Sequence, residues 1–455
     1  MPSFAQSEAA VTTRLQYLLH QDSATVSIWT PSVRHFYRVV AYKPVWTAEA
    51  GWLPVASECL RLLSRAPEFG LLPADYHTNA LLQLTDSLQC PAPDELRLRQ
   101  RIRAELLLSA GLLQFSQHLR YGRLTQRPFP PQLAAADAAL NGVAVLHQAR
   151  RAGAVAQTIL ALQPTSRSYV RLLWAWQHLL RTDTVRARRL KPLVAVNLER
   201  LRWEPQADSV YLVVNIPAYV LQIVRGPRIV RTHRVVVGGK ATPTPEFYSR
   251  LTYFQTSPEW RVPRSIAVNE ILPRLRRNSG YLASNNYNLY DHQGKLVKAQ
   301  AVNWTAITPE NFPYQIRQTA CCDNALGNVV FRFPNPHDIY LHDTPAREFF
   351  ERPNRALSHG CIRLQNPLQL GSFLLRRDAN QDATPRIKRM WDSVYSGETV
   401  IFSLRRPLPI VIRYLTCEAD GPTLRTHADV YGRDAALLKA FYQISAEPLL
   451  TNADH

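Results

Sequence analysis

The sequence predicts a multidomain α+β protein: an all-helical N-terminal domain, then a mostly β domain with a mixed α/β insertion. Residues 1–165 have apolar residues at helical spacing, most regularly over residues 104–123. The pattern changes near Tyr211, where β-branched and aromatic runs separated by turn residues begin. With 455 residues, 46% of them hydrophobic, the chain is long enough for two or three domains with cores of their own.

These patterns divide the chain into four segments. Residues 1–165 are expected to form the helical domain, and residues 166–208 a helical connector. Residues 209–405 are expected to form the mostly β domain, in which the polar residues 264–328, rich in Asn and Tyr, are an insertion. Residues 406–455 are expected to add a strand and a helix as a C-terminal extension.

The net charge of +19 indicates either a well-solvated surface or attraction to a polyanion, such as nucleic acid, anionic lipid or an acidic wall polymer. The basic residues are scattered along the chain and no nucleic-acid-binding motif accompanies them. We therefore expect no nucleic-acid partner.

The cysteines and the first residues of the chain indicate the cellular compartment in which the protein works. The six cysteines form no dense disulfide framework, although Cys59 with Cys90 and Cys321 with Cys322 could pair. No apolar run approaches the length of a transmembrane helix. Residues 3–6 are similar to the tail of a secretory cleavage site without its apolar region. We expect an exported protein whose signal peptide is absent or trimmed in this chain.

Residues 339–364 contain the chemically most informative pattern. His342 lies nineteen positions before Cys361 (361 − 342 = 19), and Ser358-His359-Gly360 runs directly into that cysteine. A cysteine is a good nucleophile only as thiolate, so it needs a neighbouring base or a positive field. Gly360 allows a backbone bend in which successive N–H groups point at one oxyanion. The pattern predicts acyl transfer through a thioester, with Cys361 as nucleophile and His342 as base.

Local structure supports this geometry. A strand up to Leu341, a turn with Pro345, a short helix and a return strand from Cys361 would bring His342 close to Cys361. Arg363 would share a strand face with Cys361, where its guanidinium suits a substrate carboxylate and favours the thiolate. Tyr340 would share a face with His342, either lining the cleft or packing.

Other interpretations of these residues remain open. A lone Cys is often a buried apolar residue, and a lone His is often a core residue with its hydrogen bonds satisfied. A Cys/His metal site is a further option, but the other Cys and His residues show no paired ligand spacing of the zinc kind. We therefore expect neither a metal nor a cofactor.

The motif resembles the L,D-transpeptidase (YkuD-type) catalytic domain, whose pattern is a His, a gap, then Ser/Thr-His-Gly-Cys, an apolar residue and Arg. His342 and residues 358–363 fill every position of that pattern. Further segments resemble the larger, periplasmic kind of this family, which carries a helical scaffold domain: NLERLRW (197–203), VNIPAY (214–219), residues 257–275, FRFPN (331–335), YLHDTP (340–345), residues 429–438, GLLPADYH (70–77) and LRYGR (119–123).

The resemblance implies a YkuD-like sandwich that acts on peptidoglycan in the periplasm or cell envelope, with a part in cell-wall synthesis and cell shape. Cys361 would attack the diaminopimelate carbonyl of a tetrapeptide stem and expel D-Ala, and the amine of a second stem would complete a 3→3 cross-link. Carbapenems would acylate the same cysteine. The implied site residues are the backbone N–H groups of His359, Gly360 and Cys361 as oxyanion hole, and Ser358, Arg363 and Tyr340 as substrate contacts.

Two departures from the family pattern stand out. Only about 35 residues separate Ser166 from Leu201 (201 − 166 = 35), too few for the peptidoglycan-binding module that such proteins often carry. Wall binding would then depend on the catalytic cleft and the basic charge. The family's usual Pro-Gly step before residues 324–327 is replaced here by Cys321-Cys322-Asp323, so the shape of this loop is open.

The sequence leaves other functions open. An L,D-carboxypeptidase, or an enzyme that links or releases wall-bound proteins, would use the same thiol with a different acceptor. A catalytically silent scaffold that recruits wall-synthesis partners belongs to another class, and the intact Cys361 and His342 argue against it. The insertion, residues 264–328, could act as a lid that keeps water from the thioester. Oligomeric state and protein partners are not readable.

Overall fold

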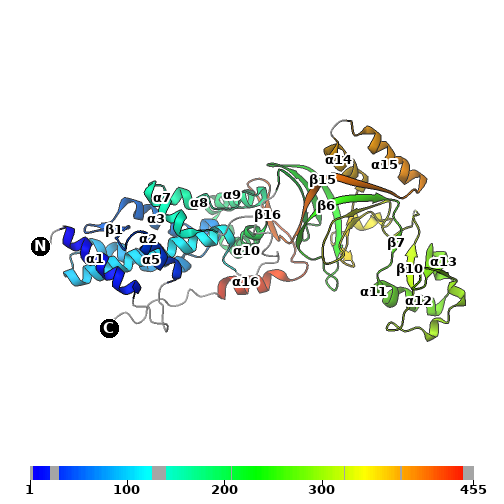
Figure 1. Ribbon diagram of the computed structural model, residues 1–455, viewed down its shortest axis with the longest axis horizontal. Helices are drawn as coiled ribbons and strands as arrows, with labels where there is room; N and C mark the ends of the chain where they lie inside the picture. Colours follow the sequence, from blue (N-terminus) through cyan, green and yellow to red (C-terminus); the bar gives the residue numbers. More distant parts are fainter. Residues whose placement is uncertain are drawn as a thin grey trace. The chain divides into compact units, whose positions relative to one another are not determined.

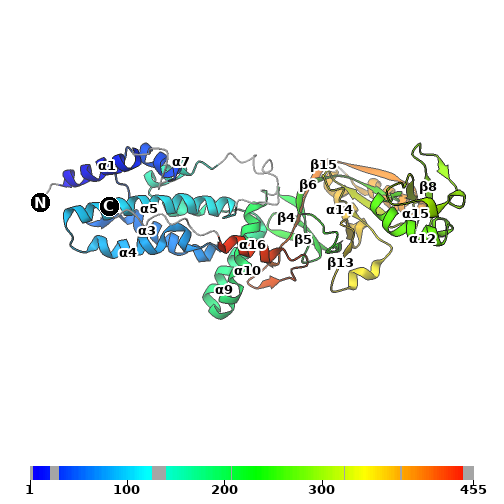
Figure 2. The same ribbon diagram turned by 90° about the horizontal axis from the view of Figure 1, so that it is seen from below.

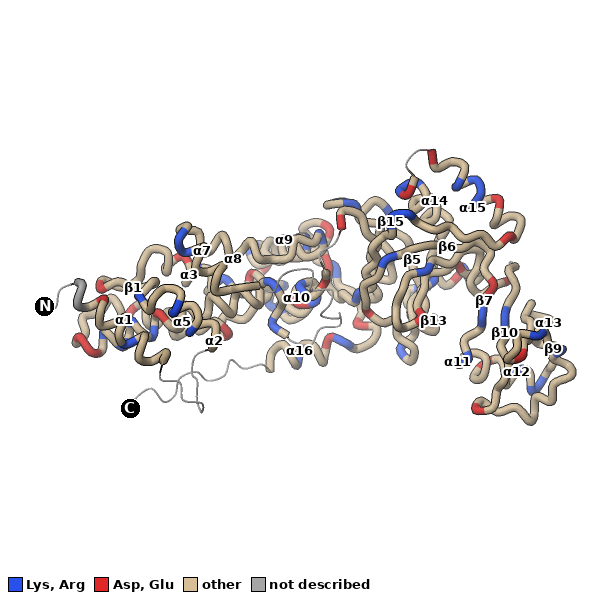
Figure 3. The backbone as a smooth tube through the Cα atoms, viewed as in Figure 1, with Lys and Arg blue, Asp and Glu red and all other residues tan. Residues whose placement is uncertain are grey.

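The computed structural model describes residues 4–20, 30–124, 140–205, 208–321, 323–379 and 382–443. It contains two compact units, residues 1–206 with 415–455, and residues 207–414 (Figure 1). Lys and Arg residues are spread along both units rather than gathered in one segment (Figure 3). No helix in the described ranges combines the length and hydropathy that crossing a membrane requires.

The first unit is helical, and the long helix α5 is its centre. In Figure 2, α5 lies between α1 on one side and α3 and α4 on the other. The helices and short elements of this unit are α1 (Phe4–His20), α2 (Pro31–Val39), α3 (Pro54–Ser64), η1 (Ala66–Phe69), η2 (Pro73–Tyr76), α4 (Thr78–Gln89), α5 (Asp94–Tyr121), α7 (Gly142–Arg151), α8 (Val155–Leu160), α9 (Arg167–Thr182), α10 (Thr184–Trp203) and α16 (Arg433–Gln443), with the strand pairs β1 (Thr47–Ala48)/β2 (Gly51–Trp52) and β16 (Cys417–Ala419)/β17 (Leu424–Thr426).

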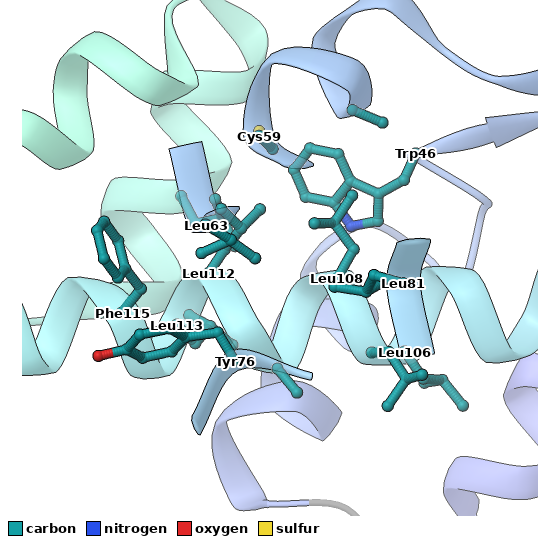
Figure 4. Packing of buried hydrophobic residues seen from close by; sticks show 14 of the residues in the cluster. Trp46, Cys59, Leu63, Tyr76, Leu81, Leu106, Leu108, Leu112, Leu113 and Phe115 are labelled. Carbon is teal, nitrogen blue, oxygen red and sulfur yellow. The ribbon is translucent and has the colours of Figure 1, made fainter. Parts of the chain in front are cut away.

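The core of this unit forms where α5 is buried on several sides. Leu108, Leu112 and Phe115 of α5 pack among Trp46 and Tyr76 (Figure 4). This surrounding contact explains why the α5 sequence is apolar over most of its second half rather than along one stripe.

One buried charge on α5 fixes a neighbouring loop. Glu105 is fully buried, and its carboxylate accepts hydrogen bonds from the backbone N–H groups of Val45, Trp46 and Thr47 (2.7 to 2.9 Å) and from the Tyr37 hydroxyl (2.8 Å). Because a buried carboxylate needs such donors, this residue ties the loop to the core helix.

The NLERLRW segment at the end of α10 binds the returning C-terminal segment. The Asn197 side chain accepts a hydrogen bond from the Thr416 N–H (2.9 Å) and donates to the Thr416 hydroxyl (3.0 Å), and both residues are fully buried. Arg200 pairs with Asp434 of α16 at 2.6 Å. Residues 415–443 are therefore part of the helical unit.

The second unit is built on one nine-stranded sheet that closes on itself. Its strands are β3 (Val210–Asn215), β4 (Val220–Arg225), β5 (Arg228–Gly238), β6 (Phe247–Thr256), β11 (Val329–Arg332), β12 (Leu341–His342), β13 (Ala356–Ser358), β14 (Ile362–Leu364) and β15 (Val400–Arg413). The order is β13-β5-β14-β12-β11-β6-β15-β3-β4, and β4 also pairs with β5, which closes a barrel-like sheet. Helices α14 (Pro367–Asp378) and α15 (Thr384–Ser396) pack on β15 and β6 (Figure 1).

An insertion between β6 and β11 has its own small core. A four-stranded sheet of order β7-β10-β8-β9 packs with short helices around Leu272, Leu289, Trp304 and Ile316. Its elements are β7 (Trp260–Arg261), α11 (Arg264–Ile266), η3 (Ala267–Ile271), α12 (Leu272–Arg277), α13 (Tyr281–Ser284), β8 (Tyr287–Tyr290), β9 (Leu296–Val297), η4 (Ala299–Ala301), η5 (Trp304–Ala306) and β10 (Gln315–Gln318).

The predicted fold class is confirmed, a helical N-terminal region followed by a mostly β domain, but the structure divides the chain differently from our four segments. Residues 166–205 form α9 and α10 of the helical unit, not a separate connector. The expected boundary at residue 405 lies inside β15. The two prolines of this strand, Pro407 and Pro409, lie near the irregular pairing with β6 between Ser403 and Leu408. Proline lacks an N–H, so here it disturbs the ladder without ending the strand.

Replacing Asn197 with alanine should destabilise the helical unit by about 3 kcal/mol, because the buried Thr416 N–H and hydroxyl lose their partner. Urea unfolding followed by circular dichroism measures this. Asn79→Ala, at an exposed position of α4, is the matched control and should cost less than about 0.5 kcal/mol. Equal unfolding midpoints for the two variants would contradict this account of the segment.

Candidate active site

The parallel pairing of two short strands places the predicted residues together. In β12 and β14, Leu341 pairs with Ile362 and His342 with Arg363, and the Ile362 N–H donates to the Tyr340 carbonyl at 3.1 Å. Partners in a ladder point to the same face, so His342 and Arg363 do so here. Extending the register by one residue sets Cys361 opposite Tyr340. The structure therefore brings four of the five predicted side chains, those of Cys361, His342, Arg363 and Tyr340, to one face of the sheet.

Cys361 is partly exposed beside Tyr340. Its Sγ lies 3.8 Å from the Asp338 carbonyl oxygen. Burial raises the pKa of the Cys361 thiol, whereas hydrogen bonds from the Tyr340 backbone and hydroxyl and the charge of Arg332 lower it. The Arg332 guanidinium lies over the Tyr340 ring, 4.2 Å from its centroid. The shift is upward overall, so the resting residue is a thiol.

His342 is buried as a neutral imidazole. Its Nδ1 lies 2.5 Å from the Asp343 carbonyl oxygen, which can only accept, so Nδ1 is the protonated nitrogen. Burial, and then the charge of Arg363, lower the pKa of His342 to about 3, against the opposing effect of hydrogen bonds to the backbone of Asp343 and Ala325. A neutral imidazole on the same sheet face as a protonated thiol is the form that can take up the thiol proton during attack, and a stable ion pair at rest is not favoured.

The turn at residues 324–327 supports the backbone around His342. The buried Asn324 amide donates to the carbonyls of Pro258 and Thr319 at 3.1 and 2.8 Å. Gly327 has a φ of +56°, and a Cβ there would lie 2.6 Å from Asp343 side-chain atoms. This close approach requires glycine and seats the turn against the residue that follows His342. Cys322, just before the turn, lies outside the described residues.

The loop before Cys361 is shaped by its own hydroxyl groups. Gly360 has a φ of +114°, which favours glycine, and the Thr244 hydroxyl donates to its carbonyl at 2.7 Å. The Ser358 hydroxyl donates to the Cys361 carbonyl at 2.5 Å and accepts from the Gly360 N–H at 3.2 Å.

Ser358 and Gly360 are bonded to each other within this loop. Ser358 is 5% exposed and its hydroxyl is bonded within the loop, so its expected contact with a substrate stays a prediction. The Gly360 N–H is already donated to Ser358. Within the described part of the chain, the N–H groups of His359 and Cys361 have no acceptor.

Arg363 is half-buried on the same face as Cys361. Its guanidinium lies 5.3 Å from the centroid of the Phe349 ring, and its Nε has no hydrogen-bond partner among the described residues. Burial lowers the pKa of Arg363, an effect that Glu348 opposes. A desolvated guanidinium with an unused donor is suited to an anionic group.

The insertion reaches this site at two points. The Tyr340 hydroxyl hydrogen-bonds Trp260 of β7 as well as Cys361. The His359 Nε2 lies 2.7 Å from the Glu270 Oε1 of η3. Arg332, Trp260 and Glu270 were not assigned roles from the sequence. All three lie in segments that resemble the family: Arg332 in residues 331–335, and Trp260 and Glu270 in residues 257–275. That resemblance was the signal in the sequence that could have pointed to them.

The structure also addresses the cysteines and metal binding. Cys59, Cys90, Cys321, Cys361 and Cys417 are free, so the considered Cys59–Cys90 pair does not form. Among residues with a described placement, no group of three or more His, Cys, Asp or Glu side chains could hold a metal ion.

Alkylation of Cys361 by iodoacetamide should show a pH midpoint above that of a free thiol such as glutathione, because only the thiolate reacts and burial raises its pKa. Peptide-resolved mass spectrometry isolates Cys361 from the other thiols. Arg332→Gln removes a charge that lowers this pKa and should move the midpoint further up, whereas Arg332→Lys should not. A wild-type midpoint below that of glutathione would show a resting thiolate instead.

Comparisons with known proteins identify two domains in the chain. Residues 209–402 match the YkuD L,D-transpeptidase catalytic domain, and residues 31–175 match the Scaffold domain. A putative L,D-transpeptidase of Haemophilus influenzae is 36% identical over 241 residues, 53% of this chain and 48% of that protein. The match thus spans about half the length of this relative.

Two solved structures are more distant. L,D-transpeptidase 1 of Mycobacterium tuberculosis and an L,D-transpeptidase from Mycobacterium smegmatis are each 12% identical and cover 45% of this chain, with TM-scores of 0.17 and 0.18. The matches cover 62% and 58% of those chains, and they are too weak to bear on the fold. The chain therefore contains a YkuD L,D-transpeptidase catalytic domain, residues 209–402, preceded by an N-terminal Scaffold domain, residues 31–175.

Proposed function

We propose that this protein is a peptidoglycan L,D-transpeptidase that forms 3→3 cross-links through a thioester on Cys361. The observation that carries the proposal is the parallel β12–β14 register, which sets Cys361, Tyr340, His342 and Arg363 on one face. Family membership supports the transpeptidase-type activity. Its place of action is then the cell envelope, where peptidoglycan lies.

In the donor half-reaction, His342 takes the proton of the Cys361 thiol as the sulfur attacks the diaminopimelate carbonyl of a tetrapeptide stem. The C–S bond forms and the carbonyl oxygen becomes an oxyanion. The C–N bond to the terminal D-Ala then breaks, and the proton held by His342 passes to the leaving amine. A neutral imidazole, as its lowered pKa requires, is the form that can start this sequence.

The oxyanion needs donors already in place. The N–H groups of His359 and Cys361 have no acceptor among the described residues, so we assign them this role. The N–H of Gly360 would join them only after leaving the Ser358 hydroxyl. Removal of one such donor costs roughly a hundred- to a thousand-fold in rate.

In the acceptor half-reaction, the amine of a second stem attacks the thioester carbonyl. The C–N bond forms, the C–S bond breaks, and the amine proton returns to sulfur through His342. Water would give a tripeptide instead of a cross-link. We propose that the insertion limits that hydrolysis, because Trp260 and Glu270 place it at the site. The same thiol is expected to be acylated by carbapenems.

Arg363 is assigned to a carboxylate of the donor stem. Arg363→Gln should raise KM for the tetrapeptide donor roughly tenfold or more, because a charge-assisted hydrogen bond is lost. Steady-state kinetics with a tetrapeptide muropeptide measure this. Arg363→Lys keeps the positive charge but not the paired N–H donors of the guanidinium, so its KM should lie between those of Arg363→Gln and wild type. An unchanged KM in both variants would remove Arg363 from the donor site.

The proposed function is tested by incubating the protein with purified tetrapeptide muropeptides and identifying the products by mass. Cross-linked dimers together with released D-Ala are expected, and Cys361→Ala should abolish both. Tripeptides without dimers would identify an L,D-carboxypeptidase. No turnover at all, with wild type indistinguishable from Cys361→Ala, would favour the catalytically silent scaffold.

A further inference from the structure

The insertion presents one carboxylate to the loop that carries the nucleophile. Glu270 Oε1 lies 2.7 Å from His359 Nε2, two residues before Cys361, and the two side chains are 43% and 54% exposed. The second oxygen of Glu270 makes no hydrogen bond with the described residues. The donor half-reaction uses neither side chain. Exposed pairs of this kind contribute little to folding, so stability alone does not account for the arrangement.

The charges around Cys361 are divided between elements of the unit. Arg332 and Arg363, from β11 and β14, are the cations that act on the Cys361–His342 pair. Glu348 faces Arg363, and Asp338 is next to Cys361 on the β12 side. Glu270, from the insertion, pairs with His359 on the loop before Cys361. The Arg363 side of the site therefore suits an anionic donor group, whereas the insertion places the carboxylate of Glu270 beside His359.

An aromatic ring lies near this carboxylate: burial, and with it the charges of Tyr281 and Glu270, raise the pKa of Tyr287 to about 12, against the charge of Arg274. Trp260 and Tyr287 lie 6.3 Å apart between ring centroids, and Tyr281 lies 6.3 Å from Tyr287. The Arg274 guanidinium lies over the Tyr281 ring, 5.3 Å from its centroid, and donates to the Tyr281 hydroxyl at 2.6 Å, so the open rings are those of Trp260 and Tyr287. A carboxylate beside partly exposed aromatic rings is a setting in which an ammonium group binds by charge and by cation–π contact.

We propose that Glu270, oriented by His359, binds the ammonium group of the acceptor stem, so that the insertion supplies the acceptor subsite. This inference rests on the proposed transpeptidase function. The ligand class is a primary ammonium, the form in which a stem amine exists at neutral pH.

The acceptor reaction starts from the ammonium bound at Glu270. The bound ammonium loses one proton to water, to which Glu270 and His359 are both open, and becomes the neutral amine. The amine attacks the thioester, the C–N bond forms and the C–S bond breaks. The second nitrogen proton passes through His342 to the leaving sulfur, which restores the thiol.

The test compares wild type with Glu270→Gln, which removes the charge at constant shape. With tetrapeptide muropeptides, the ratio of dimers to tripeptides should fall roughly tenfold or more in Glu270→Gln. With hydroxylamine, which is uncharged at neutral pH, the yield of hydroxamate relative to tripeptide should stay at the wild-type level. Glu310→Gln, an exposed carboxylate elsewhere on the insertion, is the matched control and should keep the wild-type ratio.

Three outcomes distinguish a failure of the Glu270 acceptor subsite from a failure of the proposed transpeptidase function. An unchanged dimer-to-tripeptide ratio in Glu270→Gln overturns the acceptor subsite. An equal loss with hydroxylamine also overturns it, because the effect would then not depend on acceptor charge. Wild type that forms neither dimers nor tripeptides instead refutes the proposed function. Glu270→Asp, which keeps the charge, should recover part of the ratio and so excludes a folding effect of the first variant.

Discussion

The parallel register between β12 and β14 is the constraint on which the site depends. Two residue pairs, Leu341 with Ile362 and His342 with Arg363, hold together segments that the sequence separates by a helix and a loop. The closed sheet fixes this register from both sides, because β12 also pairs with β11 and β14 with β5. A slip of one residue would turn Cys361 to the opposite face from His342.

Burial of His342 and Cys361 in this sheet sets their protonation states. His342 is neutral because it is buried near Arg363, and the Cys361 thiol is protonated because burial outweighs Arg332. We therefore propose that proton transfer accompanies the attack itself and does not start from a preformed ion pair. The insertion contacts the site through Trp260 and Glu270, and we propose that the Glu270 carboxylate serves the acceptor.

Much of this arrangement could be predicted from the sequence. Alternation and turn residues predict the order of helical and β domains, and the spacing of His342, Cys361 and Arg363 predicts their meeting on one face. Local patterns could not show that the Ser358 hydroxyl takes the Gly360 N–H, because that bond depends on the loop's backbone angles. The contact of Glu270 with His359 could not be predicted either, because only the tertiary folding of the insertion brings the two residues together. The boundary at residue 405 failed because β15 continues past its prolines.

The most direct measurement is the site of covalent acylation. After incubation with meropenem, intact-mass and peptide-mapping spectrometry should find one adduct, on Cys361. The adduct should be absent from Cys361→Ala and should form far more slowly in His342→Ala. An adduct on another residue, or an equal rate of formation without His342, would contradict the account of Cys361 as a nucleophile activated by a buried neutral imidazole.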